Sequence, residues 1–320
     1  MSIPPFTNIG HRQFLVWLGF TFVMIATMTS AAAQTLSFKQ LLDRANRPTL
    51  TAKIAYGAHA DQFGELWLPP NVNNAAAPAK KLPVVILIHG GCWRADLPGP
   101  ELVAFLADDL RQQGVAVWSI TYRRVATKAD NFSPYPDTFL DVAAAAEKIR
   151  ELAKIYPLDL TRIVTTGHSA GGHLAMWLAA RHRLPKDSPL YQSAPLPIGA
   201  VVGIAAMPDL AYAKVASAHA CGADTVDLLI NSRDRKESAY RDTSITPLLP
   251  LGVNQILISG VYDAIVAPAQ ALRHRERAKE KNETVELITL DHAGHFELIA
   301  PWTPAGRTVV DTIVKQARLN

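Results

Sequence analysis

Apolar segments of two kinds alternate along most of the chain, beginning near residue 51. Short continuous runs of branched side chains, such as Val-Val-Ile-Leu-Ile at 84–88, are typical of strands buried on both faces of a sheet. Longer segments rich in Ala and Leu, such as 136–155, are typical of helices. Because strands that alternate with helices form parallel sheets, the pattern predicts a doubly wound α/β fold.

Eight strands are predicted in a mostly parallel sheet, and the first two form an antiparallel pair. The strands are expected at 51–56, 63–68, 84–88, 115–121, 162–166, 198–206, 255–260 and 284–290. Helices that flank the sheet are expected at 101–113, 136–155, 268–281 and 308–318. Residues 207–250 contain no clear strand, and we expect them to form a small helical insertion over the sheet.

The first 33 residues have the composition of a secretory signal peptide. A single basic residue, Arg12, precedes an apolar stretch at 14–28, and Ala31-Ala32-Ala33 provides a cleavage site. We therefore expect export to the periplasm or the medium, and a mature chain of residues 34–320 that forms one domain. The alternative is an uncleaved membrane anchor, because the apolar stretch counted on to Ala33 reaches about 20 residues.

The charge of the chain is small and evenly spread. Its 32 Lys and Arg residues and 28 Asp and Glu residues give a net charge of +4. The basic residues form no long run and are not interleaved with aromatic side chains, so the sequence does not favour nucleic-acid binding. The sequence holds no Cys and His cluster with metal-ligand spacing, and no segment beyond the leader is apolar enough to cross a membrane.

One stretch carries the strongest indication of chemistry. A β-branched run at 162–166 is followed by Gly-His-Ser-Ala-Gly at 167–171 and then by an Ala-, Leu- and Met-rich segment. A Gly-x-Ser-x-Gly sequence between a strand and a helix is the pattern of a nucleophile elbow. It predicts Ser169 as a nucleophile at the helix N-terminus, with Gly167 and Gly171 leaving room for the sharp turn. The alternative is a glycine-rich turn that only packs closely.

A serine nucleophile needs a base to take its proton and an acid to orient that base. On a sheet of this type both are expected later in the chain. Asp263 follows the strand expected at 255–260, which places it at the carboxyl edge of the sheet, and it is the predicted acid. Asp209 and Asp291 are the alternatives. Asp209 follows one strand too early for the usual arrangement.

The predicted base is His295, which comes directly after the last strand. It is favoured over His292 because Gly294 allows the backbone to turn immediately before it. The resulting order of Ser169, Asp263 and His295 is the order expected of a serine hydrolase on this type of sheet.

Backbone amides that stabilise an oxyanion are expected at two places. One is Ala170, the residue after the nucleophile, and the other is the loop His-Gly-Gly-Cys-Trp at 89–93. In that loop the predicted donors are Gly91 and Cys92, while His89 is expected to anchor the loop.

Together, the segments 89–93, 167–172 and 294–296 and Asp263 resemble the α/β-hydrolase superfamily. They are most similar to the branch of carboxylesterase and kynurenine formamidase-like enzymes with a His-Gly-Gly-x-Trp loop. The resemblance implies an eight-stranded sheet, no cofactor, and hydrolysis of an ester or activated amide.

Two observations place an ester before a formamide as the substrate. Cys92 stands where enzymes of this branch carry Tyr or Gly, and an export signal suits tryptophan catabolism poorly. An arylformamidase is therefore the alternative to a serine esterase acting on a small or medium ester. A non-catalytic binding protein on the same fold is the alternative from another class, and it is disfavoured because all three triad residues are present.

The remaining candidates are two aromatic residues and a pair of cysteines. Trp93 and Tyr262 are candidate substrate-binding residues, with core packing as the alternative for each. Cys92 and Cys221 are a candidate disulfide, because export would place them in an oxidising compartment. The alternative is two unpaired thiols.

Overall fold

An eight-stranded sheet lies at the centre of the fold, in the order β1-β2-β4-β3-β5-β6-β7-β8. The pairs β1–β2 and β2–β4 are antiparallel, and all other neighbours are parallel. The predicted α/β class, the count of eight strands and the antiparallel opening pair are confirmed. The strands are β1 (Ala52–Ala55), β2 (Phe63–Trp67), β3 (Leu82–Ile88), β4 (Ala116–Ile120), β5 (Leu158–His168), β6 (Ala200–Ile204), β7 (Asn254–Gly260) and β8 (Val285–Leu290).

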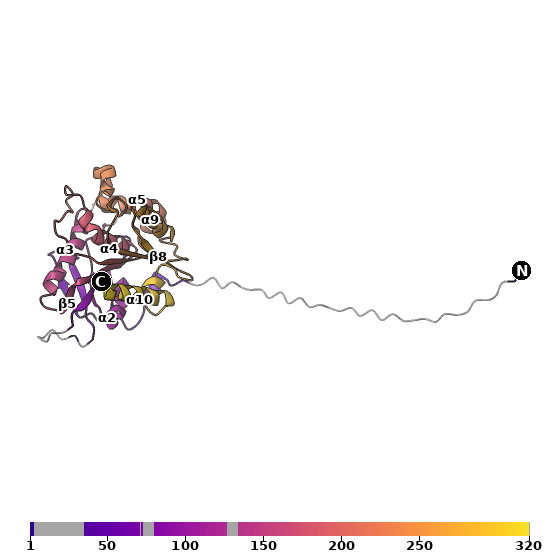
Figure 1. The fold of residues 1–320 in the computed structure, drawn as a ribbon, viewed down its shortest axis with the longest axis horizontal. Helices are drawn as coiled ribbons and strands as arrows, with labels where there is room; N and C mark the ends of the chain where they lie inside the picture. Colours follow the sequence, from indigo (N-terminus) through magenta and orange to yellow (C-terminus); the bar gives the residue numbers. More distant parts are fainter. Residues whose placement is uncertain (3–34, 71, 73–79, 127–133, 320) are drawn as a thin grey trace. The chain divides into compact units, whose positions relative to one another are not determined.

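Helices cover both faces of this sheet. In Figure 1, α2 and α10 lie together on one side, and α3, α4 and α9 lie on the other. The longer helices are α2 (Ala104–Gln112), α3 (Asp137–Leu152), α4 (Ala170–Ala180), α9 (Ala269–Lys279) and α10 (Pro304–Leu319). The 3₁₀ helices outside residues 207–250 are η1 (Pro100–Leu102), η2 (Arg181–Arg183) and η5 (Glu297–Ile299).

The region 207–250 is made of short helical pieces between β6 and β7. They are α5 (Leu210–Ala216), α6 (Ala218–Cys221), α7 (Thr225–Ile230), α8 (Ser232–Arg235), η3 (Lys236–Tyr240) and η4 (Thr246–Leu248). A further short helix, α1 (Phe38–Leu42), precedes the sheet and was not predicted.

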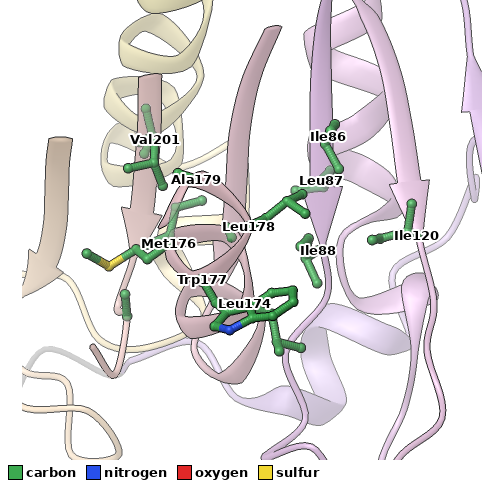
Figure 2. Close-up of a cluster of buried hydrophobic side chains, with 14 of the residues drawn as sticks. Ile86, Leu87, Ile88, Ile120, Leu174, Met176, Trp177, Leu178, Ala179 and Val201 are labelled. Atoms are coloured by element: carbon green, nitrogen blue, oxygen red, sulfur yellow. The ribbon is translucent and has the colours of Figure 1, made fainter. Parts of the chain in front are cut away.

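The hydrophobic core includes the contact between the sheet and α4, whose residues are all buried. Figure 2 shows buried side chains of α4, including Leu174 and Leu178, and of β3, including Leu87 and Ile88, which point to opposite faces of the sheet. Each of these side chains is at most 2% exposed. Burial of one such side chain contributes about 1.5–3 kcal/mol, so this contact fixes α4 firmly on the sheet.

The parallel strands β3, β5, β7 and β8 end at the same edge of the sheet. The segments that follow them contain the oxyanion loop, the elbow serine and the predicted acid and base. Because residues beyond the carboxyl ends of parallel strands gather at one edge, the topology brings these four segments together.

The structure is a computed structural model that describes residues 1–2, 35–70, 72, 80–126 and 134–319. Apart from its first two residues, the expected signal peptide at 1–33 lies outside the described residues. Among the described helices, none combines the length and the apolar character needed to cross a membrane.

Candidate active site

Ser169 occupies a tight turn between β5 and α4. Its φ is 58° and its ψ is −121°, a conformation that costs a non-glycine residue energy and must be held by its surroundings. The Ser169 amide donates to the Ile204 carbonyl at 2.8 Å, which fixes the turn to the neighbouring strand. A Cβ on Gly167 would lie 2.2 Å from the Gly171 oxygen, and a Cβ on Gly171 would lie 2.1 Å from the Ile88 oxygen. Both glycines are therefore required for close approach, as the sequence suggested.

Asp263 and His295 form a buried hydrogen-bonded pair beside this turn. His295 Nδ1 lies 2.7 Å from Asp263 Oδ2, and since a carboxylate only accepts, the imidazole donates. The other carboxylate oxygen, Oδ1, accepts from the amides of Ile265 at 2.8 Å and Val266 at 2.7 Å. This arrangement orients the imidazole and leaves its Nε2 free of the proton.

The alternatives for the acid and the base have other surroundings. Asp209 caps α5 through the Tyr212 amide and pairs with Arg273 at 2.9 Å. Asp291 and His292 are exposed. His292 carries the positive φ of this loop, 59°. The turn therefore lies earlier than the sequence suggested, and Gly294 is required for space instead, because a Cβ there would lie 2.9 Å from Glu297 and from Thr35.

A second histidine, His168, lies against the base. Its ring centroid is 4.2 Å from that of His295, and its Nε2 donates to the His295 carbonyl at 3.0 Å. Burial, followed by the nearby His295, lowers the pKa of His168 well below its usual value of 6.5. His168 is thus held neutral, supports the backbone of the base and adds no competing charge beside it.

The oxyanion loop has an unusual backbone. Three consecutive residues have positive φ: Gly91 (96°), Cys92 (51°) and Trp93 (56°). His89 anchors the loop, since its ring stacks on Tyr122 with centroids 4.7 Å apart. In the described part of the chain, the amides of Gly91 and Cys92 donate to no other group. The same holds for the Ala170 amide at the start of α4, so three donors remain for a ligand.

A disulfide joins Cys92 to Cys221, whose Cα atoms are 5.3 Å apart. It connects the oxyanion loop to α6 in the helical region 207–250. On its other side α6 is tied to the loop of the acid, because His219 Nε2 donates to the Ala264 carbonyl at 2.7 Å. Arg94 adds a hydrogen bond to the Cys221 carbonyl. The short helix α6 therefore braces the loops on the two sides of the site.

Ser169 and His295 line one pocket together with Gly91 and Cys92, with a volume of about 200 Å³. The remainder of its wall is almost entirely apolar. Apart from His168, the wall residues that the sequence did not predict are Phe38, Leu97, Leu102, Ala220, Ile265 and Phe296.

The two candidate substrate-binding aromatic residues do not line this pocket. Trp93 is fully buried and packs edge-on against His173, with ring centroids 5.5 Å apart. Tyr262 is 49% exposed and lies against His292. Proximity in sequence to a catalytic motif was a poor guide, because the turns after the strands point these side chains elsewhere.

One unpredicted pocket residue had a local signal in the sequence. Ser37 and Gln40 form a capping box, in which Ser37 Oγ accepts from the Gln40 amide and Gln40 Oε1 accepts from the Ser37 amide. This Ser-x-x-Gln pattern before a buried Leu41 indicates a helix start, and it would have located α1 and Phe38.

A parallel sheet with a serine at a strand–helix turn, and an acid–histidine pair following later strands, defines an α/β-hydrolase. The model of the BD-FAE family matches residues 71–277. The chain belongs to this family.

Known relatives and solved structures agree with this class. Esterase LipC of Mycobacterium tuberculosis is 29% identical over 260 residues, which cover 77% of this chain and 60% of LipC. The chain thus spans about 60% of the length of that relative. Esterase B from Lactobacillus rhamnosis superposes with a TM-score of 0.71 at 18% identity, over 88% of this chain and 91% of the other. A carbohydrate esterase from gut microbiota gives 0.64 at 20% identity, over 85% and 97%.

Proposed function

We propose that this protein is a serine esterase that cleaves carboxylic esters of small or medium substrates through an acyl-enzyme. One observation carries the proposal: Ser169, in its strained turn, shares a pocket with His295, which is hydrogen-bonded to Asp263. The name of the relative LipC, an esterase, supports the same reaction.

The chemistry follows from the positions of these groups. His295 Nε2 takes the proton of Ser169 Oγ as the oxygen attacks the ester carbonyl, and it later returns that proton to the leaving alcohol. Asp263 holds the imidazole in the required tautomer and stabilises its positive charge. The amides of Gly91, Cys92 and Ala170 receive the oxyanion, and water then releases the acid by the reverse sequence.

The pocket favours an uncharged apolar substrate group. Apart from the catalytic and oxyanion residues and His168, its wall is formed by aliphatic and aromatic side chains. Its volume of about 200 Å³ exceeds that of an apolar cavity of about 150 Å³ that is known to hold benzene. An acyl or alcohol group of ring size or slightly larger therefore fits. A charged group would lose its hydration without gaining a partner.

We also propose that the protein is exported and cleaved after Ala33. The disulfide between Cys92 and Cys221 supports this, since such bonds persist mainly in oxidising compartments. Cell fractionation and N-terminal sequencing of the purified protein test it. A cytoplasmic protein that retains residues 1–33 would refute it.

The esterase is tested by steady-state hydrolysis with the purified protein and its Ser169→Ala variant. The substrates are p-nitrophenyl esters from acetate to decanoate, with N-formylkynurenine beside them. The variant should lose at least about 10³-fold in kcat/KM, because the nucleophile is gone while the oxyanion donors remain.

Each other outcome points to a specific alternative. Preference for N-formylkynurenine would favour an arylformamidase. Equal background rates from both proteins on every substrate would refute the triad and favour a binding protein on a hydrolase fold.

A further inference from the structure

The wall of the pocket includes a side chain from the very start of the described fold. Phe38, the first residue of α1, lines the pocket and packs against Phe296, with ring centroids 5.9 Å apart. Phe296 lines the same pocket and directly follows His295. Phe38 is thus in contact with the segment that carries the base, although it lies 257 positions before His295 in the sequence.

The segment before α1 is tied to the histidine loop by one carboxylate. Glu297, which is 9% exposed, accepts from the Leu36 amide through Oε1 and from the Gly294 amide through Oε2 at 3.0 Å. Within the described residues Glu297 forms no ion pair, so these two amides are the partners that compensate its buried charge.

Close packing reinforces this connection. A Cβ on Gly294 would lie 2.9 Å from Thr35 Cγ2, so the chain at Thr35 rests directly on the backbone before His295. The helix α1 is also held by the fully buried Leu41 and by contact with η1, which contributes Leu102 to the pocket. The segment 35–42 is therefore in contact with two parts of the chain that line the pocket, the histidine loop and η1.

We propose that the segment 35–42 is the specificity element of this esterase: Phe38 limits the size of the substrate group that the pocket accepts, and Glu297 positions Phe38. The inference rests on the proposed function. The side chain of Phe38 has no polar atom and takes no part in the reaction. Its truncation therefore enlarges the pocket without removing a reacting atom. Glu297 acts through the segment and is a positioning residue.

The first test compares the wild-type protein with Phe38→Ala on p-nitrophenyl esters of increasing acyl length. A second series of butyrate esters varies the alcohol, because either group can occupy the pocket. In one of the series, the ratio of kcat/KM for the longest to the shortest substrate should rise by about 10-fold or more, the discrimination expected of an apolar wall. Turnover of the smallest substrate should change by less than about threefold.

Phe105→Ala is the matched control. Phe105 is also half-buried and also forms an aromatic pair, with Trp302 at 5.2 Å, but it does not line this pocket. It should leave both ratios unchanged. Unchanged ratios in Phe38→Ala as well would overturn the inference.

The role of Glu297 is tested with Glu297→Gln. Because the two backbone amides donate to different carboxylate oxygens, the amide oxygen of Gln replaces the acceptor of only one of them, and its NH₂ group faces the other. Its size preference should shift in the same direction as that of Phe38→Ala. In the double variant the shift should equal that of Phe38→Ala alone, because Glu297 acts on selectivity through Phe38. Additive shifts would contradict this.

Glu283→Gln controls for the loss of such a clamp. Glu283 also accepts two backbone amides, those of Leu251 at 2.8 Å and Gly252 at 2.6 Å, outside the pocket. It should lower the melting temperature and leave the size preference intact.

Binding of p-nitrophenyl butyrate and p-nitrophenyl decanoate to the Ser169→Ala variant, measured by calorimetry with and without Phe38→Ala, gives a readout that needs no turnover. If the wild-type protein hydrolyses no ester, the proposed function fails, and this binding comparison still decides the role of Phe38. If hydrolysis occurs but neither turnover nor binding depends on Phe38, only the present inference fails.

Discussion

Replacement of Asp263 by Asn tests the triad more sharply than its removal, because the structure predicts which way the amide will point. Asp263 Oδ1 accepts two backbone amides, from Ile265 and Val266, while Oδ2 accepts only His295. Asn has one oxygen. In the opposite orientation the NH₂ group of Asn would face the backbone, and the amides of Ile265 and Val266 would lose their acceptor. Each unsatisfied amide would cost about 1–3 kcal/mol. The oxygen should therefore stay with the backbone, and the NH₂ group should face His295 Nδ1.

That orientation disables the base. Nδ1 must then accept a hydrogen bond, so the proton of the imidazole moves to Nε2, which can no longer take the proton of Ser169. We expect kcat/KM to fall by about 10⁴-fold, equivalent to about 5.4 kcal/mol, with little change in KM.

The assay is hydrolysis of p-nitrophenyl butyrate by the wild-type protein and by Asp263→Asn, with circular dichroism to verify folding. Asp209→Asn is the matched control, since Asp209 also follows a strand but pairs with Arg273. It should retain activity within about threefold of wild type. If Asp263→Asn kept more than a tenth of the activity, or if Asp209→Asn lost as much, the assignment of the acid would be wrong.

Two further predictions concern the disulfide and the buried histidines. Cys221→Ser should lower the free energy of unfolding by about 2–5 kcal/mol, and it should reduce kcat because it releases the oxyanion loop. Urea unfolding measures the first effect and ester turnover the second. Unchanged turnover would contradict the bracing role of the disulfide. Burial lowers the pKa of His89 to about 3 and of His173 and His274 to about 4. The unfolded chain binds these protons from pH 6.5 downward and the folded chain does not, so stability should fall between pH 6.5 and 4 by up to roughly 1.4 kcal/mol per pH unit for each histidine. Equal unfolding free energies at pH 7 and pH 5 would contradict this.

Helix ends and short helices show where pattern reasoning lost accuracy. The helix expected at 101–113 divides at Val103 into η1 and α2. The last helix begins at Pro304 rather than at 308, because proline is well suited to the first turn, where its missing amide has no partner. The segment α1 was not predicted, although its capping box was present in the sequence.

The sequence alone determined the sheet and the four segments that meet at its edge. Strands buried on both faces, the glycines of the elbow and the order of serine, acid and histidine are all local patterns, because each depends on a few neighbouring residues. Because the carboxyl ends of parallel strands lie at one edge of a sheet, the order of the strands is enough to predict that these segments meet.

Only the tertiary structure decided what forms the walls of the site. Whether a side chain after a strand turns inward depends on the loops packed around it, so Trp93 packs in the core and Tyr262 faces solvent, whereas Phe38 and Ile265 line the pocket. The two hydrogen bonds of Glu297, too, require contact between segments far apart in the sequence, at Leu36 and at Gly294. Chemistry at the strand ends follows from local pattern, while selectivity arises from packing between distant segments, which no short stretch of sequence encodes.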